Sequence, residues 1–334
     1  MTDAIVAEGL RREYGDTAAL DGVSLSVGAG EVFALVGPNG AGKTTLVRAL
    51  TGTTTLDSGS VSVLGDHPRN LDRSRLGLLP QSFDPPERLT ARELVAYYAG
   101  LYDEARDPGS VLESVGMDDD ATWYEKLSGG QQRRTCVGTA LVNDPDVLFL
   151  DEPTTGIDPA GRRALWSLVE DLAASGTTVF LTTHDMAEAE RLADRVGLLA
   201  DGRLVAVGSP AELVAEFGGR TRVVVDLTTD TTDIPASADA AASALADAGF
   251  EVETTDDSLV VRGVSPEDIG EVVAALDAEA VAYDALAWTE PDLEDAFLEL
   301  AGRSVADGDP TALAGMNDDV GENHGETAVA EGDR

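Results

Sequence analysis

Positive charge is scarce in this 334-residue sequence, which has 23 lysine and arginine residues against 62 acidic ones and a formal net charge of −39. Only Lys43 and Lys126 are lysines. Because nucleic-acid binding needs basic patches that neutralise phosphates, this balance argues strongly against a DNA or RNA partner. The acid excess indicates either a disordered, solvating chain or a protein adapted to molar salt, where charges are screened within about 3 Å at 1 M. Periodic apolar segments favour the second, halophilic interpretation.

Cysteine and long apolar runs are also lacking. Cys136 is the single cysteine, which excludes an intramolecular disulfide and suits a reducing compartment. Its place in a predicted helix favours a packed core thiol over a reactive one. No run approaches the ~20 apolar residues of a membrane span, and residues 1–10 do not read as a signal peptide. The sequence therefore predicts a cytoplasmic protein that reaches a membrane only through a partner.

Strand and helix patterns alternate along the first two thirds of the chain. Short apolar runs at 31–37, 76–81, 146–153 and 177–185 end in glycine or polar loops, and helical patterns lie between or after them. This alternation predicts an α/β fold with a parallel sheet covered by helices. Residues 195–209 then predict a hairpin that turns at Asp201 and Gly202.

The pattern changes at residues 216–222, which predict a linker after a first domain of residues 1–218. Beyond the linker the predicted order is β-α-β-β-α-β, the ferredoxin-like plan, followed by an amphipathic helix at 291–303. We therefore predict a small α+β accessory domain at residues 221–303. Residues 304–334 are acidic and glycine-rich, with few large apolar side chains, which predicts a disordered tail.

The segment GPNGAGKT fits the phosphate-binding loop G-x-x-x-x-G-K-[ST], and it follows a predicted strand and opens a predicted helix. Glycines let backbone N–H groups converge on phosphate oxygens, and the helix N-terminus adds positive potential. Lys43 can reach the β- and γ-phosphates, and the Thr44 hydroxyl can ligate Mg²⁺. This P-loop NTPase motif predicts ATP binding by Gly37, Pro38, Asn39, Gly40, Ala41, Gly42, Lys43, Thr44 and Thr45.

The segment DVLFLDEP supplies a second half of a nucleotide site. Its apolar residues 147–150 predict a buried strand that delivers Asp151 and Glu152 to the edge where α/β sheets bind ligands. Asp151 can hold Mg²⁺, directly or through water, and Glu152 can polarise the water that attacks the γ-phosphate. A solvated acidic loop is the alternative, but two carboxylates at the end of an apolar strand argue against it.

A second glycine turn, LSGGQ at residues 127–131, lies between these two motifs. The ordered motifs between residues 4 and 217 resemble the ATP-binding-cassette (ABC) family, whose signature this turn is. The resemblance implies that two such domains pair head to tail, so that the turn faces the ATP of a second copy or of a homologous ATPase subunit. At a helix N-terminus, a hydroxyl and backbone N–H groups form a second anion site. The residues concerned are Ser128, Gly129, Gly130 and Gln131.

The resemblance also implies roles for single residues elsewhere. Tyr14 matches the aromatic that stacks on adenine, although a lone surface tyrosine is the alternative. Gln81 matches the glutamine that senses Mg²⁺ and the attacking water. His184 matches the histidine that contacts the γ-phosphate, and Asp158 matches the loop that crosses the dimer interface. Catalysis is thus assigned to Glu152, His184 and Gln81, and Mg²⁺ binding to Thr44, Gln81 and Asp151.

The sequence departs from the family pattern just after the signature turn. Thr135, Cys136 and Gly138 stand where larger apolar helix formers are expected. This departure predicts looser helix packing at that point.

The motifs also narrow the kind of ABC protein. Residues 46–126 between the two glycine turns are too few for the long coiled coil of DNA-repair members. Translation factors of the family carry two cassettes and basic surfaces, whereas this chain has one cassette and is acidic. The remaining role is the ATP-hydrolysing motor of a membrane transporter with a separate multi-span permease, on the inner face of the cell membrane. The ending LEDAFLELAG resembles export-type motors of drug- and sodium-extrusion systems (ABC-2 type). A helical subdomain is expected at about 83–136, with the permease contact at 83–101. The alternative to a transporter motor is a soluble ATP-dependent switch protein that regulates a partner without transport.

Overall fold

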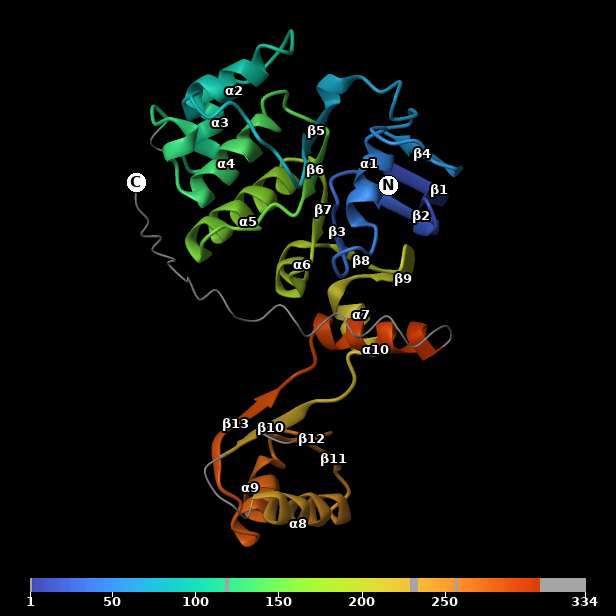
Figure 1. Cartoon of the computed structure of the whole chain (residues 1–334), viewed down its shortest axis with the longest axis vertical. Coiled ribbons are helices and arrows are strands. Elements are labelled where there is room, and N and C mark those ends of the chain that lie inside the picture. The colour runs from blue at the N-terminus through green and yellow to red at the C-terminus, as the bar shows by residue number, and fades with distance from the viewer. Residues whose placement is uncertain (1, 118–119, 229–233, 256–257, 307–334) are drawn as a thin grey trace, which may run out of the picture.

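The largest element of the fold is a six-stranded sheet with the order β5-β6-β7-β3-β8-β9, seen edge-on in Figure 1. A computed structural model describes residues 2–117, 120–228, 234–255 and 258–306. All neighbouring strands are parallel except β8 and β9, which form the predicted hairpin. The strands are β3 (Val32–Val36), β5 (Leu76–Leu79), β6 (Val147–Asp151), β7 (Thr178–Thr183), β8 (Arg195–Ala200) and β9 (Arg203–Gly208).

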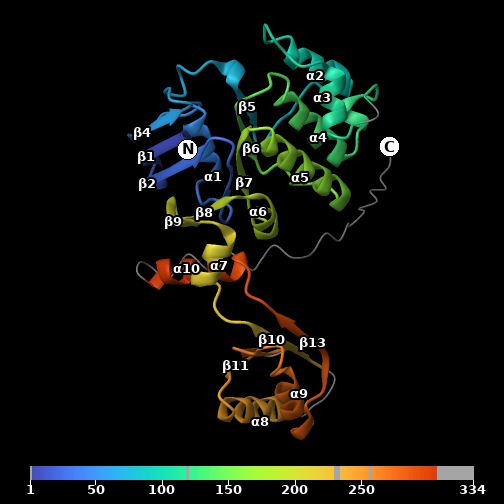
Figure 2. The ribbon, with the colours of Figure 1, turned by 180° about the vertical axis from the view of Figure 1, so that it is seen from behind.

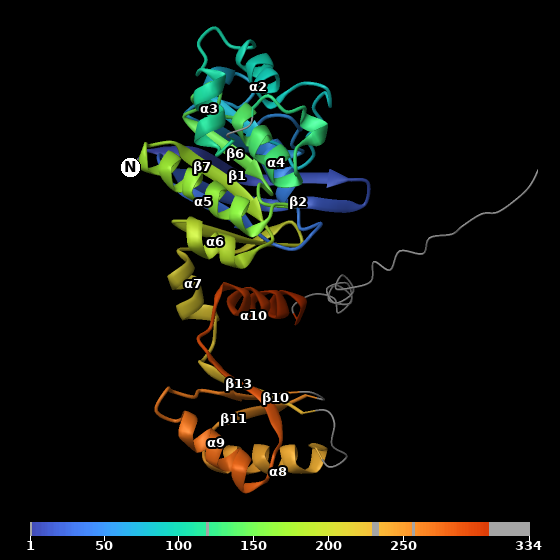
Figure 3. The ribbon, with the colours of Figure 1, turned by 90° about the vertical axis from the view of Figure 1, so that its left-hand side faces the viewer.

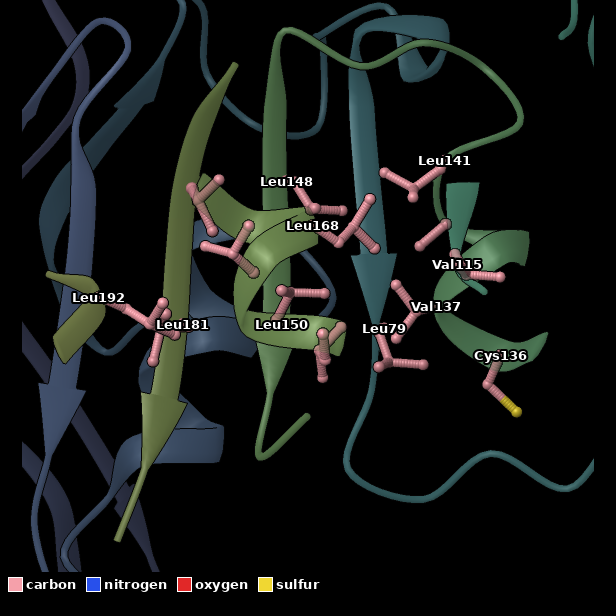
Figure 4. Packing of buried hydrophobic residues seen from close by; sticks show 14 of the residues in the cluster. Leu79, Val115, Cys136, Val137, Leu141, Leu148, Leu150, Leu168, Leu181 and Leu192 are labelled. Carbon is pink, nitrogen blue, oxygen red and sulfur yellow. The ribbon is translucent and has the colours of Figure 1, made fainter. Parts of the chain in front are cut away.

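Both faces of this sheet are covered, which is why its strands read as continuous apolar runs. In β3, Ala34 faces one core and Phe33 the other, as the period of two in a strand requires. The first core includes α5 (Pro159–Ala174) and α6 (Met186–Leu192). Figure 4 shows their leucines against those of β6 and β7. The second core includes α1 (Lys43–Leu50).

A three-stranded antiparallel sheet closes the second core, and the sequence patterns above did not reveal it. Its order is β2-β1-β4, with β1 (Asp3–Tyr14), β2 (Thr17–Gly28) and β4 (Ser58–Val63). The signal was present in β2, where the buried Val23, Leu25 and Val27 alternate with serines. Such alternation is typical of a strand with one buried face.

Three helices gather at the β5 end of the large sheet, as Figures 1 and 2 show. They are α2 (Ala91–Ala99), α3 (Pro108–Ser114) and α4 (Gly129–Thr139). Of two short 3-10 helices, η1 (Arg73–Arg75) precedes β5 and η2 (Tyr124–Lys126) precedes α4. The prediction of looser packing after the signature turn is wrong, because Thr135 and Cys136 are fully buried. A Cβ on Gly138 would lie 3.4 Å from Val111, an ordinary van der Waals distance, so this part of α4 lies against α3.

A separate four-stranded antiparallel sheet follows α7 (Pro210–Phe217) and residues 218–221, where the linker was predicted. Its strand order is β11-β12-β10-β13, and Figure 3 shows its two helices on one face. Apolar residues such as Val225, Leu245 and Leu259 fill the space between sheet and helices. The elements are β10 (Arg222–Leu227), α8 (Ile234–Asp247), β11 (Glu251–Thr254), β12 (Ser258–Arg262), α9 (Ile269–Ala278) and β13 (Tyr283–Thr289), in the predicted order.

The closing helix α10 (Leu293–Ala306) returns to the first part of the chain. Leu293 and Phe297 are buried in the core that contains α5 and α6, and α10 contacts α7 and α6. The prediction that this helix belongs to an accessory domain at 221–303 is therefore wrong. The helix also runs three residues beyond the predicted end at 303, and the predicted tail from 307 on lies outside the described residues. Within the described ranges, no helix has the length and apolarity needed to cross a membrane.

Candidate functional site

The phosphate loop, residues 37–45, connects β3 to α1 and can be built only with glycine at two positions. Gly42 has φ +106°, a conformation that L side chains rarely adopt, and a Cβ there would lie 2.2 Å from the carbonyl oxygen of Ala19. A Cβ on Gly37 would lie equally close to the carbonyl oxygen of Leu199. The loop is thus held tightly against β2 and β8. Its last residues form the first turn of α1, where backbone N–H groups have no partner within the helix.

Lys43 is 5% exposed and lies over this loop. Its ammonium donates to the carbonyl oxygens of Gly37 at 2.6 Å and Pro38 at 3.1 Å, and lies 3.6 Å from Glu152 Oε1. Burial lowers the pKa of Lys43, and the Glu152 carboxylate opposes that shift. A cavity of about 270 Å³ is lined by the loop together with Gln81 and Glu152. The Lys43 ammonium and the Glu152 carboxylate thus form an ion pair in the wall of this cavity.

Asp151 ends β6 and Glu152 follows it directly, at the predicted edge of the sheet, and one buried hydroxyl on β7 bonds to both residues. Thr182 Oγ1 donates to Asp151 Oδ1 at 2.5 Å and accepts from the Glu152 N–H at 3.0 Å. The same N–H also bonds the Thr182 carbonyl at 3.1 Å. Glu152 has φ +50°, a strained conformation for a residue with a side chain, and these bonds hold it. Sequence reasoning missed Thr182, although it lies two residues before the predicted His184.

Gln81 joins the two halves of the site. Its Nε2 donates to Glu152 Oε2 at 3.2 Å, and its Oε1 accepts from Thr44 Oγ1 at 3.4 Å. His184 Nδ1 lies 3.8 Å from Glu152 Oε1. The carboxyl ends of β3, β5, β6 and β7 thus bring the predicted loop, glutamine, carboxylates and histidine together.

Oxygen ligands converge beside Thr44, where a cavity of about 230 Å³ is also lined by Gln81 and Asp151. Hydroxyl, amide and carboxylate oxygens are suitable ligands for Mg²⁺, which in nucleotide sites takes one or two carboxylates plus phosphate oxygens and water. Among the described residues, no group of three or more His, Cys, Asp or Glu side chains could hold a metal on its own. The residues present therefore fit a magnesium ion that is shared with bound phosphates.

Tyr14 ends β1, on the antiparallel sheet rather than at the edge of the large one. Its ring is 45% exposed, with the Arg12 guanidinium 4.7 Å from the ring centroid. Its hydroxyl lies 3.5 Å from Thr54 Oγ1, and Asp57 pairs with Arg12 at 3.1 Å. These contacts orient an exposed ring that can stack on a base.

The signature turn, residues 127–131, packs against a different loop of the same chain. Ser128 caps α4 by accepting from the Gln131 N–H at 3.3 Å, and the Gln131 side chain accepts from the Ser128 N–H at 3.0 Å. A Cβ on Gly130 would lie 3.2 Å from Asp158 Oδ2. Asp158 in turn caps α5, and two backbone N–H groups of that helix lower the pKa of Asp158. The turn and Asp158 thus form one surface.

Two charged residues near the site, one half-buried and one fully buried, were missed by sequence reasoning. Arg133 on α4 donates to backbone carbonyls of the loops that carry Gln81 and Glu152. Glu188 on α6 is fully buried and accepts from Trp166 Nε1 at 3.0 Å and Thr154 Oγ1 at 3.1 Å. Burial raises the pKa of Glu188, and these hydrogen bonds oppose that shift. No spacing in the sequence links either residue to its partners.

Comparisons with known proteins agree with this geometry. A family described as "ABC transporter" matches residues 20–155. The chain is 38% identical to the Nod factor export ATP-binding protein I of Ralstonia nicotianae, over 92% of this chain and 96% of the relative. It is also 38% identical to the daunorubicin resistance ATP-binding protein DrrA3 of Streptomyces coeruleorubidus, over 90% and 96%. The dimeric post-hydrolysis structure of the ATP-binding cassette MJ0796, bound to ADP and Pi, matches with TM-score 0.56 and 25% identity, over 61% of this chain and 98% of that one.

Proposed function

We propose a working cycle from one premise: the chain belongs to the ABC transporter family and is an ATP-hydrolysing motor subunit of the export type. Relatives that span the same length are named for export or drug resistance, so a soluble switch without transport is not favoured. The observation that carries the cycle is the convergence of Lys43, Gln81 and Glu152 beyond the carboxyl ends of the parallel strands β3, β5 and β6.

The chemical step follows from the positions of these groups. The phosphate loop and Lys43 bind the β- and γ-phosphates of ATP, and Tyr14 stacks on the adenine. Gln81 and Glu152, 3.2 Å apart, orient a water molecule against the γ-phosphorus. The water oxygen bonds to phosphorus while the bond to the β–γ bridging oxygen breaks, and the Glu152 carboxylate accepts the proton. His184 donates a hydrogen bond to the γ-phosphate as ADP and phosphate form.

Three residues of this site would hold a magnesium ion. Thr44, Gln81 and Asp151 line one cavity and would hold the ion through oxygen atoms. A bound Mg²⁺ would supply positive charge to the phosphate oxygens. Thr182 keeps the Asp151 carboxylate turned in one direction through their 2.5 Å hydrogen bond.

The signature turn serves the nucleotide of a second copy in this proposal. Ser128 and Gly130 lie on the Asp158 surface of their own chain, and their hydroxyl and N–H groups are suited to an anion. The solved cassette MJ0796 is dimeric in its structure with ADP and Pi, which supports a dimer here. ATP then lies between the Lys43 loop of one copy and Ser128 of the other.

The membrane partner is a separate multi-span permease on the inner face of the cell membrane. We assign its contact to residues 83–101, within an inserted helical subdomain of about residues 83–136. Tyr97 and Leu101 of this segment are 60% and 63% exposed, which is unusual for large apolar side chains and typical of an interface. Closure of the dimer would draw the two helical subdomains together and move the permease.

The four-stranded sheet with α8 and α9 has the strand order expected of a ferredoxin-like unit. We assign residues 1–218 to the ABC domain, with α10 packed against it, and residues 219–290 to a ferredoxin-like accessory unit. This assignment replaces the boundary at 303, because Leu293 and Phe297 lie in the cassette core.

The substitution Glu152→Gln tests the cycle, because an amide keeps the size of the side chain and cannot accept the proton. The variant should bind ATP, lose hydrolysis and accumulate as a dimer in ATP, measured by size exclusion with light scattering. Glu170→Gln, an exposed control on α5, should hydrolyse ATP as wild type does. A Glu152→Gln protein that stays monomeric in ATP, or that hydrolyses it normally, would refute the cycle.

A further inference from the structure

Arg133 makes an unusual set of hydrogen bonds for an arginine in so acidic a chain. Its guanidinium donates five hydrogen bonds of 2.8 to 3.5 Å, and each goes to a backbone carbonyl rather than to a carboxylate. The acceptors are the carbonyl oxygens of Pro80, Gln81, Asp151, Glu152 and Pro153. A planar fork with five N–H donors can bridge separate loops in this way, whereas the three donors of a lysine radiate from one point.

These carbonyls belong to the two loops that carry the hydrolytic groups. The Arg133 Nη2 atom lies 2.8 Å from both the Asp151 and the Glu152 oxygen, and Nη1 lies 3.5 Å from that of Gln81. Backbone position at Gln81 and Glu152 sets whether their side chains meet at 3.2 Å. Any movement of Arg133 is therefore passed directly to the site where water attacks.

Arg133 lies on the helix that the signature turn begins. It follows Ser128 by five positions, which is about 7.5 Å along the axis of a helix. Cys136 and Val137 follow Arg133 by three and four positions, so they lie on the same face of α4, and they are buried among apolar side chains, where Figure 4 shows them. Helix α4 is thus packed with the other helices of its group, and Arg133 provides a polar connection from it to the catalytic loops.

We propose that Arg133 is a positioning residue that couples the two ATP sites of the dimer. The proposal rests on the ATP-sandwich dimer above. In each copy, Ser128 binds the partner's nucleotide, and Arg133 on the same helix holds Gln81 and Glu152 of the copy's own site. Docking of the signature turn on one ATP thereby moves the catalytic loops of the other site, and ATP binding becomes positively cooperative.

The variant Arg133→Lys tests this coupling, because it keeps the charge and shortens the reach to the loops. Wild-type ATP hydrolysis should show a Hill coefficient between about 1.5 and 2, and the variant should fall to about 1, since coupling between sites is typically 5- to 150-fold. We also expect kcat to fall by about tenfold, because the loops lose their support. The control Arg134→Lys changes the next residue, whose guanidinium bonds Gly116 instead, and should keep the wild-type Hill coefficient.

Several results would overturn the coupling. A lower kcat with an unchanged Hill coefficient would show that Arg133 only supports its own site, and a wild-type Hill coefficient of 1 would show no coupling at all. If Arg133→Lys does not fold, Arg133→Gln provides the same measurement, with thermal melts as the check on stability. ATP-dependent dimerisation of Glu152→Gln separates the two proposals, since its failure refutes the sandwich, whereas dimers without cooperativity refute only the coupling.

Discussion

The substitution Thr182→Val removes one hydroxyl and tests whether that hydroxyl sets the geometry of hydrolysis. Valine keeps the shape of the side chain but gives Asp151 no donor, and the Glu152 N–H keeps only the carbonyl bond of 3.1 Å. A hydrogen bond to a charged group contributes about 1.5 to 3 kcal/mol, so the free energy of unfolding should fall by about that amount. The N–H of Glu152, whose φ of +50° is strained, would also lose one of its two hydrogen bonds.

Activity should fall more than stability alone explains. Misplacement of a reacting group by about 1 Å can cost roughly 100-fold in rate, so we expect kcat to decrease by between about 10- and 100-fold. The dissociation constant for ATP should change by less than about threefold, because Lys43 and its loop are untouched. Steady-state ATPase rates, nucleotide titrations and urea unfolding measure the three quantities.

Two variants serve as controls. Thr182→Ser keeps the hydroxyl and should hydrolyse ATP at close to the wild-type rate. Thr178→Val makes the same replacement at the opposite end of β7, where Thr178 Oγ1 accepts from the Gly30 N–H at 3.0 Å. It should lower stability by about 1 kcal/mol and leave kcat unchanged. A Thr182→Val protein with kcat within about twofold of wild type would show that the hydroxyl does not position the carboxylates.

Three further predictions use other parts of the chain. Burial raises the pKa of Cys136, so iodoacetamide should label it only after denaturation; rapid labelling of the folded protein at pH 8 would contradict the packing seen here. Because burial raises the pKa of Glu188 above its ordinary value of 4.5, its contribution to stability is present at low pH and falls as pH rises through the folded pKa. Glu188→Gln should therefore gain stability relative to wild type between pH 4 and pH 8 in urea titrations, and a pH-independent difference would argue against this. The net charge of −39 predicts a melting temperature that rises steeply from millimolar to molar KCl, and equal melts at both concentrations would refute the halophilic interpretation.

The parts of the site that the sequence predicted are those where a strand ends in reactive groups. Residues 147–150 are continuously apolar because both faces of β6 are buried, so Asp151 and Glu152 had to emerge at the sheet edge. The phosphate loop was recognisable because Gly37 and Gly42 cannot be replaced without a clash. Local spacing was therefore enough for these groups.

The parts that were missed depend on contacts between distant segments. Thr182 on β7 contacts Asp151 on the neighbouring strand β6, 31 positions earlier in the sequence, and Arg133 contacts Pro80 from 53 positions away. A buried polar residue has no characteristic spacing from its partners, so its role appears only in three dimensions. Strand β1 was missed for a different reason, since its alternation is interrupted by bulges in its pairing with β2.

The return of α10 to the cassette has a consequence for how such a chain can change over time. A Cβ on Gly218 would lie 3.1 Å from Pro291, so the chain leaves and re-enters the cassette at nearly one point. We therefore expect that residues 219–290 can be deleted or exchanged as a module, because this cuts no strand of the six-stranded sheet. A stop codon after residue 218 is not equivalent, because it would also remove Leu293 and Phe297 and leave α7 uncovered.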